Sequence, residues 1–324
     1  MLTKGDVFFL RDLTQGNITS ILLSFAIPII FSRVFQLFYS LADTRIVGSA
    51  LGDSSLAAMS ASSTFYQLLL TFITGLTSGF AIVVARYFGA HDEQPFRRAI
   101  AGTFRWGAVI SISLTAVSLL SLPLVLQLLN IDAALLPESR SYIQLVLCGL
   151  ILSALYNLCA CVLYAVGDSF TPLIFLIIST VGNVALDILF VMVLPFGVAG
   201  AAIGTILAQG FSAIACLIYM LMRYPVLRLR KADFTPDAAM TSDLLKTGFS
   251  CGLMQSMISL GSLTLQITIN GLGETYIVAQ TAARRISEIL MMPFLALASA
   301  VGTFTSQNLG SGKLQRVRVG YQQS

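Results

Sequence analysis

The chain has 324 residues, of which 56% are hydrophobic and 10% are charged, whereas an ordinary soluble domain carries about 25% charged residues. This composition excludes such a domain and predicts an all-α polytopic membrane protein whose first partner is the lipid bilayer. The net charge of +4 does not point to nucleic acid, because the bases fall in short groups between apolar segments and form no patch.

Eight apolar segments are long enough to cross a bilayer as helices, since one crossing needs about 20 residues. Residues 1–17 precede them as a polar segment without the cleavage pattern of a signal peptide. The predicted spans are 18–46, 54–87, 95–129, 136–164, 171–193, 198–222, 241–270 and 275–308. Residues 223–240 form a polar linker between the sixth and seventh spans.

The basic residues orient these spans, because Lys and Arg resist translocation. Placing the N-terminus and every second loop in the cytoplasm collects 14 of the 19 bases on that side. Arg45 and Arg140 remain outside, and three further bases fall inside spans. We therefore expect a multi-pass protein of the cell membrane with a cytoplasmic N-terminus, and residues 1–17 and 223–240 on the cytoplasmic side.

One internal offset of 221 residues recurs between the first and last thirds of the chain. The matched positions are Leu51-Gly52-Asp53 with Leu272-Gly273-Glu274, Ala58 with Ala279, Ser78 with Ser299, Gly89 with Gly310, and Arg97 with Arg318. Six spans separate the copies, so both copies have the same orientation, as in the parallel repeats of some secondary transporters. The repeat predicts a six-helix N-lobe (18–222) followed by a partial C-lobe (241–324), which holds helices 7 and 8 and the start of helix 9.

The second copy stops where the first is beginning its third helix. A complete pair of repeats would need about 440 residues, twice the offset. We therefore expect the chain to be a fragment or a truncated reading frame of a longer product.

Two spans carry polar stripes that end in an acid, which is costly inside a bilayer and usually marks a function. Spacings of 3 and 4 place each stripe on one helix face. The first stripe is Ser32, Gln36, Tyr39 and Asp43, and the second is Ser179, Asn183 and Asp187. Each acid lies about eight residues, or about 12 Å, from its outer loop, so the two acids share a level.

Two carboxyl groups that converge in a partly dehydrated cavity cannot both ionise at low cost, so at least one is expected to keep a proton near neutral pH. This arrangement predicts a proton-coupling site. The alternative is that each acid is a structural hydrogen-bond acceptor, or that Asp43 pairs with Arg45, although Arg45 points about 200° round the helix from it. Asn157 and Thr205 either line the same cavity or serve helix packing.

The remaining polar residues of the spans indicate a particular function less specifically. Asp43 corresponds in the second repeat to Thr264, so ion coupling is expected in the first lobe alone. Glu288 is expected to pair with Arg284 or Arg285 on its own helix. Arg33 is expected inside the bundle, with no partner evident from the sequence. The five cysteines and His91 show no spacing typical of a metal site.

Five segments resemble the multidrug and toxic compound extrusion (MATE) family, in particular its DinF-like branch. They are FQLFYSLADTRIVG, LYAVGDSFTPL, STVGNVALDILF, GVAGAAIGTILAQG and FTSQNLGSGK. The resemblance implies two six-helix lobes and export of organic, often cationic, compounds in exchange for H⁺ or Na⁺. Carried over by residue, it implies ion coupling by Asp43, Asn183 and Asp187, and a substrate cavity lined by Gln36, Tyr39, Asn157, Asn183 and Thr205. The glutamate that other branches carry in helix 7 is absent, since Ile258 stands near that position.

The expected function is therefore secondary antiport of a small organic molecule, with no cofactor, no metal and no enzymatic activity. No HExxH or GxSxG motif occurs in the spans, which argues against a membrane enzyme. The alternatives are a flippase of lipid-linked saccharides with a related fold, which would show a basic lipid-facing cleft, and an inactive transporter fragment. The sequence leaves the oligomeric state open.

Overall fold

The computed structural model describes residues 12–128, 136–194, 196–271 and 273–323, apart from the side chains of 51–62, 128, 270 and 274. The described residues form helices and no strand. In chain order the elements are α1 (Ile18–Gly89), α2 (Glu93–Leu120), α3 (Leu122–Leu128), α4 (Leu136–Ala165), α5 (Phe170–Asp187), the π-helix η2 (Ile188–Val193), α6 (Gly197–Arg223), the 3₁₀ turns η3 (Pro225–Leu227) and η4 (Lys231–Phe234), α7 (Ala238–Asn270), α8 (Glu274–Gly310) and α9 (Leu314–Gln323).

Seven stretches of the described helices are long and apolar enough to cross a membrane, against the eight that we predicted from the sequence. The predicted span 241–270 is the exception. It forms α7, whose 33 residues are long enough for a crossing. Ser, Thr, Gly and Gln interrupt its apolar residues, so α7 falls short in hydropathy rather than in length. The chain is a multi-pass α-helical membrane protein.

Two predicted spans are divided in the structure. The span 95–129 is broken at Ser121, where α2 ends and the short α3 begins with Pro123 at its second position, a place that suits proline. The span 171–193 changes at Asp187 from α-helix to π-helix. Residues 129–135 of the first span lie outside the described residues.

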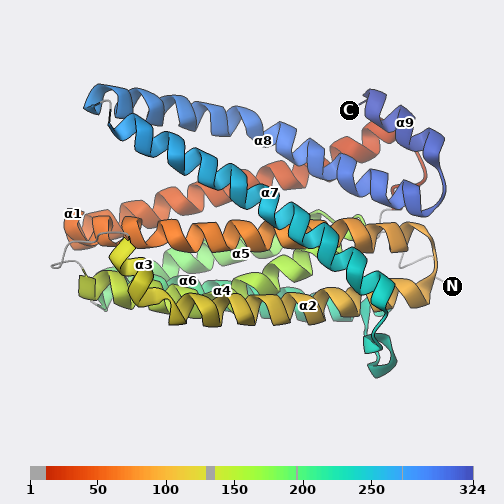
Figure 1. The fold of residues 1–324 in the computed structure, drawn as a ribbon, viewed down its shortest axis with the longest axis horizontal. Coiled ribbons are helices and arrows are strands. Elements are labelled where there is room, and N and C mark those ends of the chain that lie inside the picture. The colour runs from red at the N-terminus through yellow and green to blue at the C-terminus, as the bar shows by residue number, and fades with distance from the viewer. Residues whose placement is uncertain (1–11, 129–135, 195, 272, 324) are drawn as a thin grey trace.

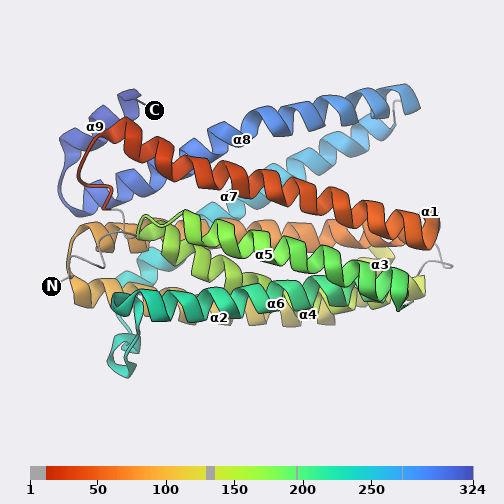
Figure 2. The same cartoon turned by 180° about the vertical axis from the view of Figure 1, so that it is seen from behind.

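The first two spans are continuous in one helix that doubles back between its crossing stretches, Ile18–Ala50 and Ser63–Gly89. Figure 1 and Figure 2 show that both chain ends lie at the same end of the bundle. We call this the N-terminal end, and it holds the start of α1, the last turn of α1 and the last turn of α8. The α7–α8 pair lies across α1 and diverges from the other helices toward the opposite end.

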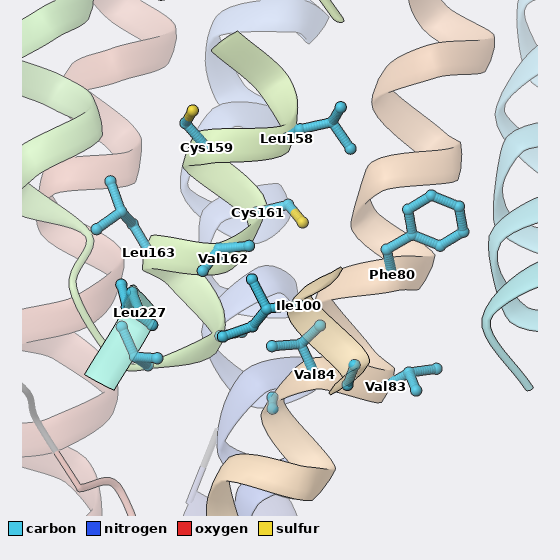
Figure 3. Packing of buried hydrophobic residues seen from close by; sticks show 14 of the residues in the cluster. Phe80, Val83, Val84, Ile100, Leu158, Cys159, Cys161, Val162, Leu163 and Leu227 are labelled. Atoms are coloured by element: carbon cyan, nitrogen blue, oxygen red, sulfur yellow. The ribbon is translucent and has the colours of Figure 1, made fainter. Parts of the chain in front are cut away.

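The largest buried apolar cluster joins the second half of α1 to α2, α4, α6 and η3. Figure 3 shows its centre, where Phe80 and Val84 of α1 lie near Ile100 of α2 and Leu158 of α4. Each of these side chains is no more than 3% exposed. This cluster binds four of the first six predicted spans together near the N-terminal end, and Met240 and Leu244 of α7 join it.

Equivalent positions of the internal repeat touch each other reciprocally at the N-terminal end. A Cβ added at Gly89 would overlap the backbone of Gln307, and one added at Gly310 would overlap the carbonyl oxygen of Arg86. Gln307 is itself the 221-residue equivalent of Arg86. At these positions each copy therefore contacts the equivalent site of the other, as in a contact with two-fold symmetry.

The same symmetry extends further into the bundle, at Gly79 and its equivalent Ala300. A Cβ at Gly79 would lie 2.6 Å from the carbonyl oxygen of Thr247 in α7. The equivalent of Gly79 is Ala300, which is fully buried in a cluster with Ala26, the equivalent of Thr247. These contacts agree with the 221-residue repeat at Gly89 and Gly310, and they do not test the other matched positions. Residue 272 and the side chains of 51–53, 58 and 274 lie outside the described residues, and the division into two lobes stays a prediction.

Candidate functional site

The two acids of the predicted coupling site meet between α1 and the end of α5. The carboxyl groups of Asp43 and Asp187 lie within hydrogen-bonding reach of each other. Asp187 is fully buried, whereas Asp43 is partly buried. The depth estimate from the sequence, which placed both acids at one level, is thereby confirmed.

Asn183 and Thr205 extend the pair into a small hydrogen-bond network. Amide oxygen and nitrogen are assigned from their partners, and the orientation that satisfies both ends of Asn183 has its nitrogen donating to Asp187 Oδ2 at 2.8 Å. Its oxygen then accepts from Thr205 Oγ1 at 3.2 Å. The hydroxyl groups of Thr205 and Tyr39 are 3.3 Å apart. Five predicted residues thus form one connected group, which we call the carboxyl network.

Small residues of α6 permit this close approach. A Cβ at Gly204 would lie 2.6 Å from Asp187 Oδ1, so any larger residue would displace the carboxyl group. One turn earlier, a Cβ at Gly200 would lie 2.7 Å from the carbonyl oxygen of Phe190 in η2. Glycines at a spacing of four let two membrane helices pack with their backbones close together.

The π-helix begins immediately after Asp187, which the sequence pattern did not predict. One-turn π segments inside α-helices are rare and are frequent at functional sites. Here the π-helix begins where α5 meets the glycine face of α6. The placement of Asp187 at this junction leaves its carboxyl group bounded by backbone on one side and by Asp43 on the other.

The carboxyl network is able to hold and release a proton. An ionised carboxylate only accepts hydrogen bonds, so two carboxyl groups remain in hydrogen-bonding contact only while one of them is protonated. Loss of that proton sets two like charges side by side in a buried site, which is strongly unfavourable. In addition, Asp43 Oδ1 is buried without a hydrogen-bond partner among the described residues.

Sequence reasoning missed several polar side chains beside this network. Tyr142 of α4 lies close enough to both acids to interact with them electrostatically. Tyr66 lies 3.0 Å from the hydroxyl of Ser153, which in turn bonds to the side-chain oxygen of Gln209. Each of these residues is a single polar side chain in an apolar helix, without the repeated spacing that revealed the two stripes.

Two predicted cavity residues do not join the network. Gln36 is exposed and makes no hydrogen bond to it among the described residues. Asn157 donates to the carbonyl oxygen of Ser153 in its own helix at 2.8 Å, so this bond neither joins the network nor crosses to another helix. Arg45 is exposed, with no ion pair to Asp43 in the described structure.

The predicted intrahelical pair of Arg284 with Glu288 is confirmed at 3.0 Å. Glu288 therefore pairs with bases of its own helix, Arg284 and Arg285. The described residues hold no cluster of three or more His, Cys, Asp or Glu side chains that could hold a metal ion.

Comparison with known proteins gives a consistent result. The MatE family pattern matches residues 28–189 and 251–324. The probable multidrug resistance protein YpnP of Bacillus subtilis is 30% identical over 94% of this chain and 68% of its own length. The DNA damage-inducible protein F of Escherichia coli is 27% identical over 80% of this chain and 56% of its own length.

A solved structure shows the same fold. The crystal structure of MATE in complex with MaL6 superposes with a TM-score of 0.91 at 23% identity, over 99% of this chain and 71% of that one. The chain thus spans about two thirds of the length of these proteins. With the family pattern matched over most of the described helices, the chain belongs to the MatE family.

Proposed function

We propose that the chain serves secondary antiport across the cell membrane: a small organic compound, often cationic, leaves the cell in exchange for protons. The observation that carries this proposal is the contact between the carboxyl groups of Asp43 and Asp187. The names of relatives support export, since YpnP is described as a probable multidrug resistance protein. The N-terminal end of the bundle is proposed to face the cytoplasm, because it carries most of the bases.

In the proposed cycle, the carboxyl network is occupied by either a proton or substrate. Protonation from outside neutralises one acid, joins Asp43 to Asp187 and lowers the negative charge that attracts a cationic group. The substrate then leaves outward. Release of the proton toward the cytoplasm restores the carboxylate charge and readies the network for the next substrate, while Asn183, Thr205 and Tyr39 rearrange their hydrogen bonds with it.

The contact between the two carboxyl groups favours protons over sodium as the coupling ion. A sodium ion would attract two ionised carboxylates, and the oxygens of Asn183, Thr205 and Tyr39 would have to turn toward it. A proton needs only the hydrogen bond that the pair is already placed to make. The test below therefore includes a sodium gradient.

The experiment is transport of the fluorescent cation rhodamine 6G by the 324-residue chain in proteoliposomes. We expect a pH gradient to drive transport, and a sodium gradient alone to drive little. Asp187→Asn is expected to abolish the response to the pH gradient, because the amide cannot exchange a proton. Glu288→Gln is the matched control, since Glu288 is exposed and paired on its own helix.

Infrared spectroscopy supplies a readout that does not depend on transport. The band of a protonated carboxyl group is expected in the wild-type chain and not in the double variant Asp43→Asn with Asp187→Asn. Undiminished proton-driven transport in both Asp43→Asn and Asp187→Asn would reject the mechanism. Equal transport with and without gradients would instead favour a flippase, and no transport by a folded wild-type chain would show that this length is insufficient.

A further inference from the structure

Arg33 is a charged residue in the middle of the first span that the proposed cycle does not use. It lies 15 residues after Ile18 and 17 before Ala50, the two limits of that span. At a rise of about 1.5 Å per residue, both ends are more than about 20 Å away. An arginine side chain is too short to extend from there to either interface, so its charge stays at membrane depth, where it costs about 3 kcal/mol or more.

No carboxylate offsets this charge among the described residues. Arg33 forms no ion pair with any described residue, and its buried Nε has no hydrogen-bond partner in the described structure. Its electrostatic neighbour is the phenol of Tyr164 on α4, an uncharged group. A buried or half-buried arginine without a counter-ion is unusual, because such groups normally pair with an acid or with backbone carbonyls.

The position of Arg33 relative to the two repeats suggests what supplies the missing anion. The buried cluster between α1 and α8 includes Ile29 and Ala296, and Ile30 packs at its edge. Arg33 follows within one helix turn of that edge. Beyond this point α1 and α8 diverge toward the opposite end of the bundle (Figure 2). Arg33 therefore lies where the contact between the repeats ends, about 15 Å along α1 from Asp43.

We propose that Arg33 binds a carboxylate or phosphate group of the transported compound, which makes the substrate an amphoteric or anionic organic molecule rather than a simple cation. The guanidinium offers planar N–H donors that match two oxygens of such a group. In an amphoteric substrate, the anionic group lies at Arg33 and the cationic group lies toward Asp43 and Asp187. This inference rests on the proposed export function, because it assigns the anion to the substrate.

The test is direct binding of dansylglycine and of its uncharged amide, dansylglycinamide, to the chain in phosphatidylcholine nanodiscs, followed by dansyl fluorescence at one fixed pH. The two probes differ only in the carboxylate. We expect the wild-type chain to bind dansylglycine about tenfold or more tightly, as charged hydrogen bonds contribute on this scale. Arg33→Gln is expected to lose that preference, and Arg33→Lys to keep part of it.

Arg45→Gln is the matched control on the same helix, because Arg45 is exposed and outside the proposed site. It is expected to bind both probes as the wild-type chain does. Thermal melts of the variants check folding, and Arg33→Lys keeps the test valid if Arg33→Gln does not fold. Equal binding of both probes by the wild-type chain, or an unchanged preference in Arg33→Gln, would overturn the proposal.

Two further arms separate the possible sources of failure. Nanodiscs that contain phosphatidylglycerol test whether a lipid phosphate takes the site. Weaker dansylglycine binding in the wild-type chain but not in Arg33→Gln would assign the site to lipid and overturn the substrate assignment. Asp187→Asn is expected to keep the preference for dansylglycine. Loss of proton-driven transport with intact probe binding would therefore implicate the coupling mechanism and not Arg33.

Discussion

The N-terminal end of the bundle and the carboxyl network use polar groups in opposite ways. At the N-terminal end, the buried side chain of Gln307 bonds to backbone at both atoms, accepting from Leu13 N at 2.9 Å and donating to the carbonyl oxygen of Ala165 at 2.8 Å. In the carboxyl network, Asp43, Asp187 and Asn183 bond chiefly to one another's side chains. One region fixes backbone positions, and the other joins groups that are able to change protonation.

This difference indicates that the N-terminal end of the bundle is the rigid region and that the carboxyl network is the region that responds to ions. Backbone partners cannot change their charge, so contacts such as those of Gln307 are insensitive to pH. The glycine pair Gly89 and Gly310 adds direct backbone contact between the repeats at the same place. The carboxyl network lies instead within the first repeat, where one proton decides whether the two acids attract or repel each other.

The largest effect is expected from filling the glycine contact at the N-terminal end. Gly310→Ala places a methyl group on the carbonyl oxygen of Arg86, and the backbones must separate. We expect a loss of about 3 kcal/mol in the free energy of unfolding, typical of severe overpacking, measured by melts in detergent. Gly302→Ala on the same helix meets no atom within 4 Å and is expected to be neutral or slightly stabilising. Equal melts for the two variants would contradict the reciprocal contact.

A smaller effect is expected from the same kind of change beside the carboxyl network. Gly204→Ala brings a Cβ to 2.6 Å from Asp187 Oδ1 and forces that flexible carboxyl group to move. We expect proton-driven transport to fall about tenfold, the loss of one charged hydrogen bond, with a nearly unchanged melt. Gly182→Ala on α5 meets no atom within 4 Å and serves as the control. Normal transport by Gly204→Ala would show that the position of Asp187 is unimportant.

The smallest effect is expected at a hydroxyl that ties the start of α5 to the end of α6. Tyr224, 1% exposed, donates to Asp168 Oδ2 at 2.6 Å. Burial, and then the bond to Asp168, raise the pKa of the Tyr224 phenol above its ordinary value. The stabilisation is therefore complete below about pH 10, the ordinary pKa of tyrosine, and is lost as the pH rises above it.

Tyr224→Phe is accordingly expected to unfold about 1 kcal/mol more easily than the wild-type chain at pH 8. The gap is expected to narrow at pH 11, because the unfolded wild-type chain then gains stability by releasing the phenolic proton. Melts of both proteins at the two pH values measure this. A gap that is the same at pH 8 and pH 11 would show that the bond to Asp168 does not set the protonation of Tyr224.

Much of this architecture follows from local patterns in the chain. Apolar length predicted the spans, and helical spacing placed Asp43 at the end of a stripe with Tyr39 because both are properties of a single helix. The offset of 221 residues predicted equivalent positions, and Gly89 and Gly310 prove to make equivalent contacts, with Gln307 and Arg86 respectively. α7 is the departure, since its length was recognised correctly while its Ser, Thr and Gln content lowers its hydropathy.

The chain by itself therefore determined the helices, their polar faces and the repeat, because these depend on neighbours within a few residues or on a regular period. Only the tertiary structure decided which polar groups meet: that Gly204 admits the carboxyl group of Asp187, that Asn157 turns to its own helix, and that Arg33 lacks an acidic partner. Such contacts depend on the approach and rotation of separate helices. The spacing along one helix carries no information about that geometry.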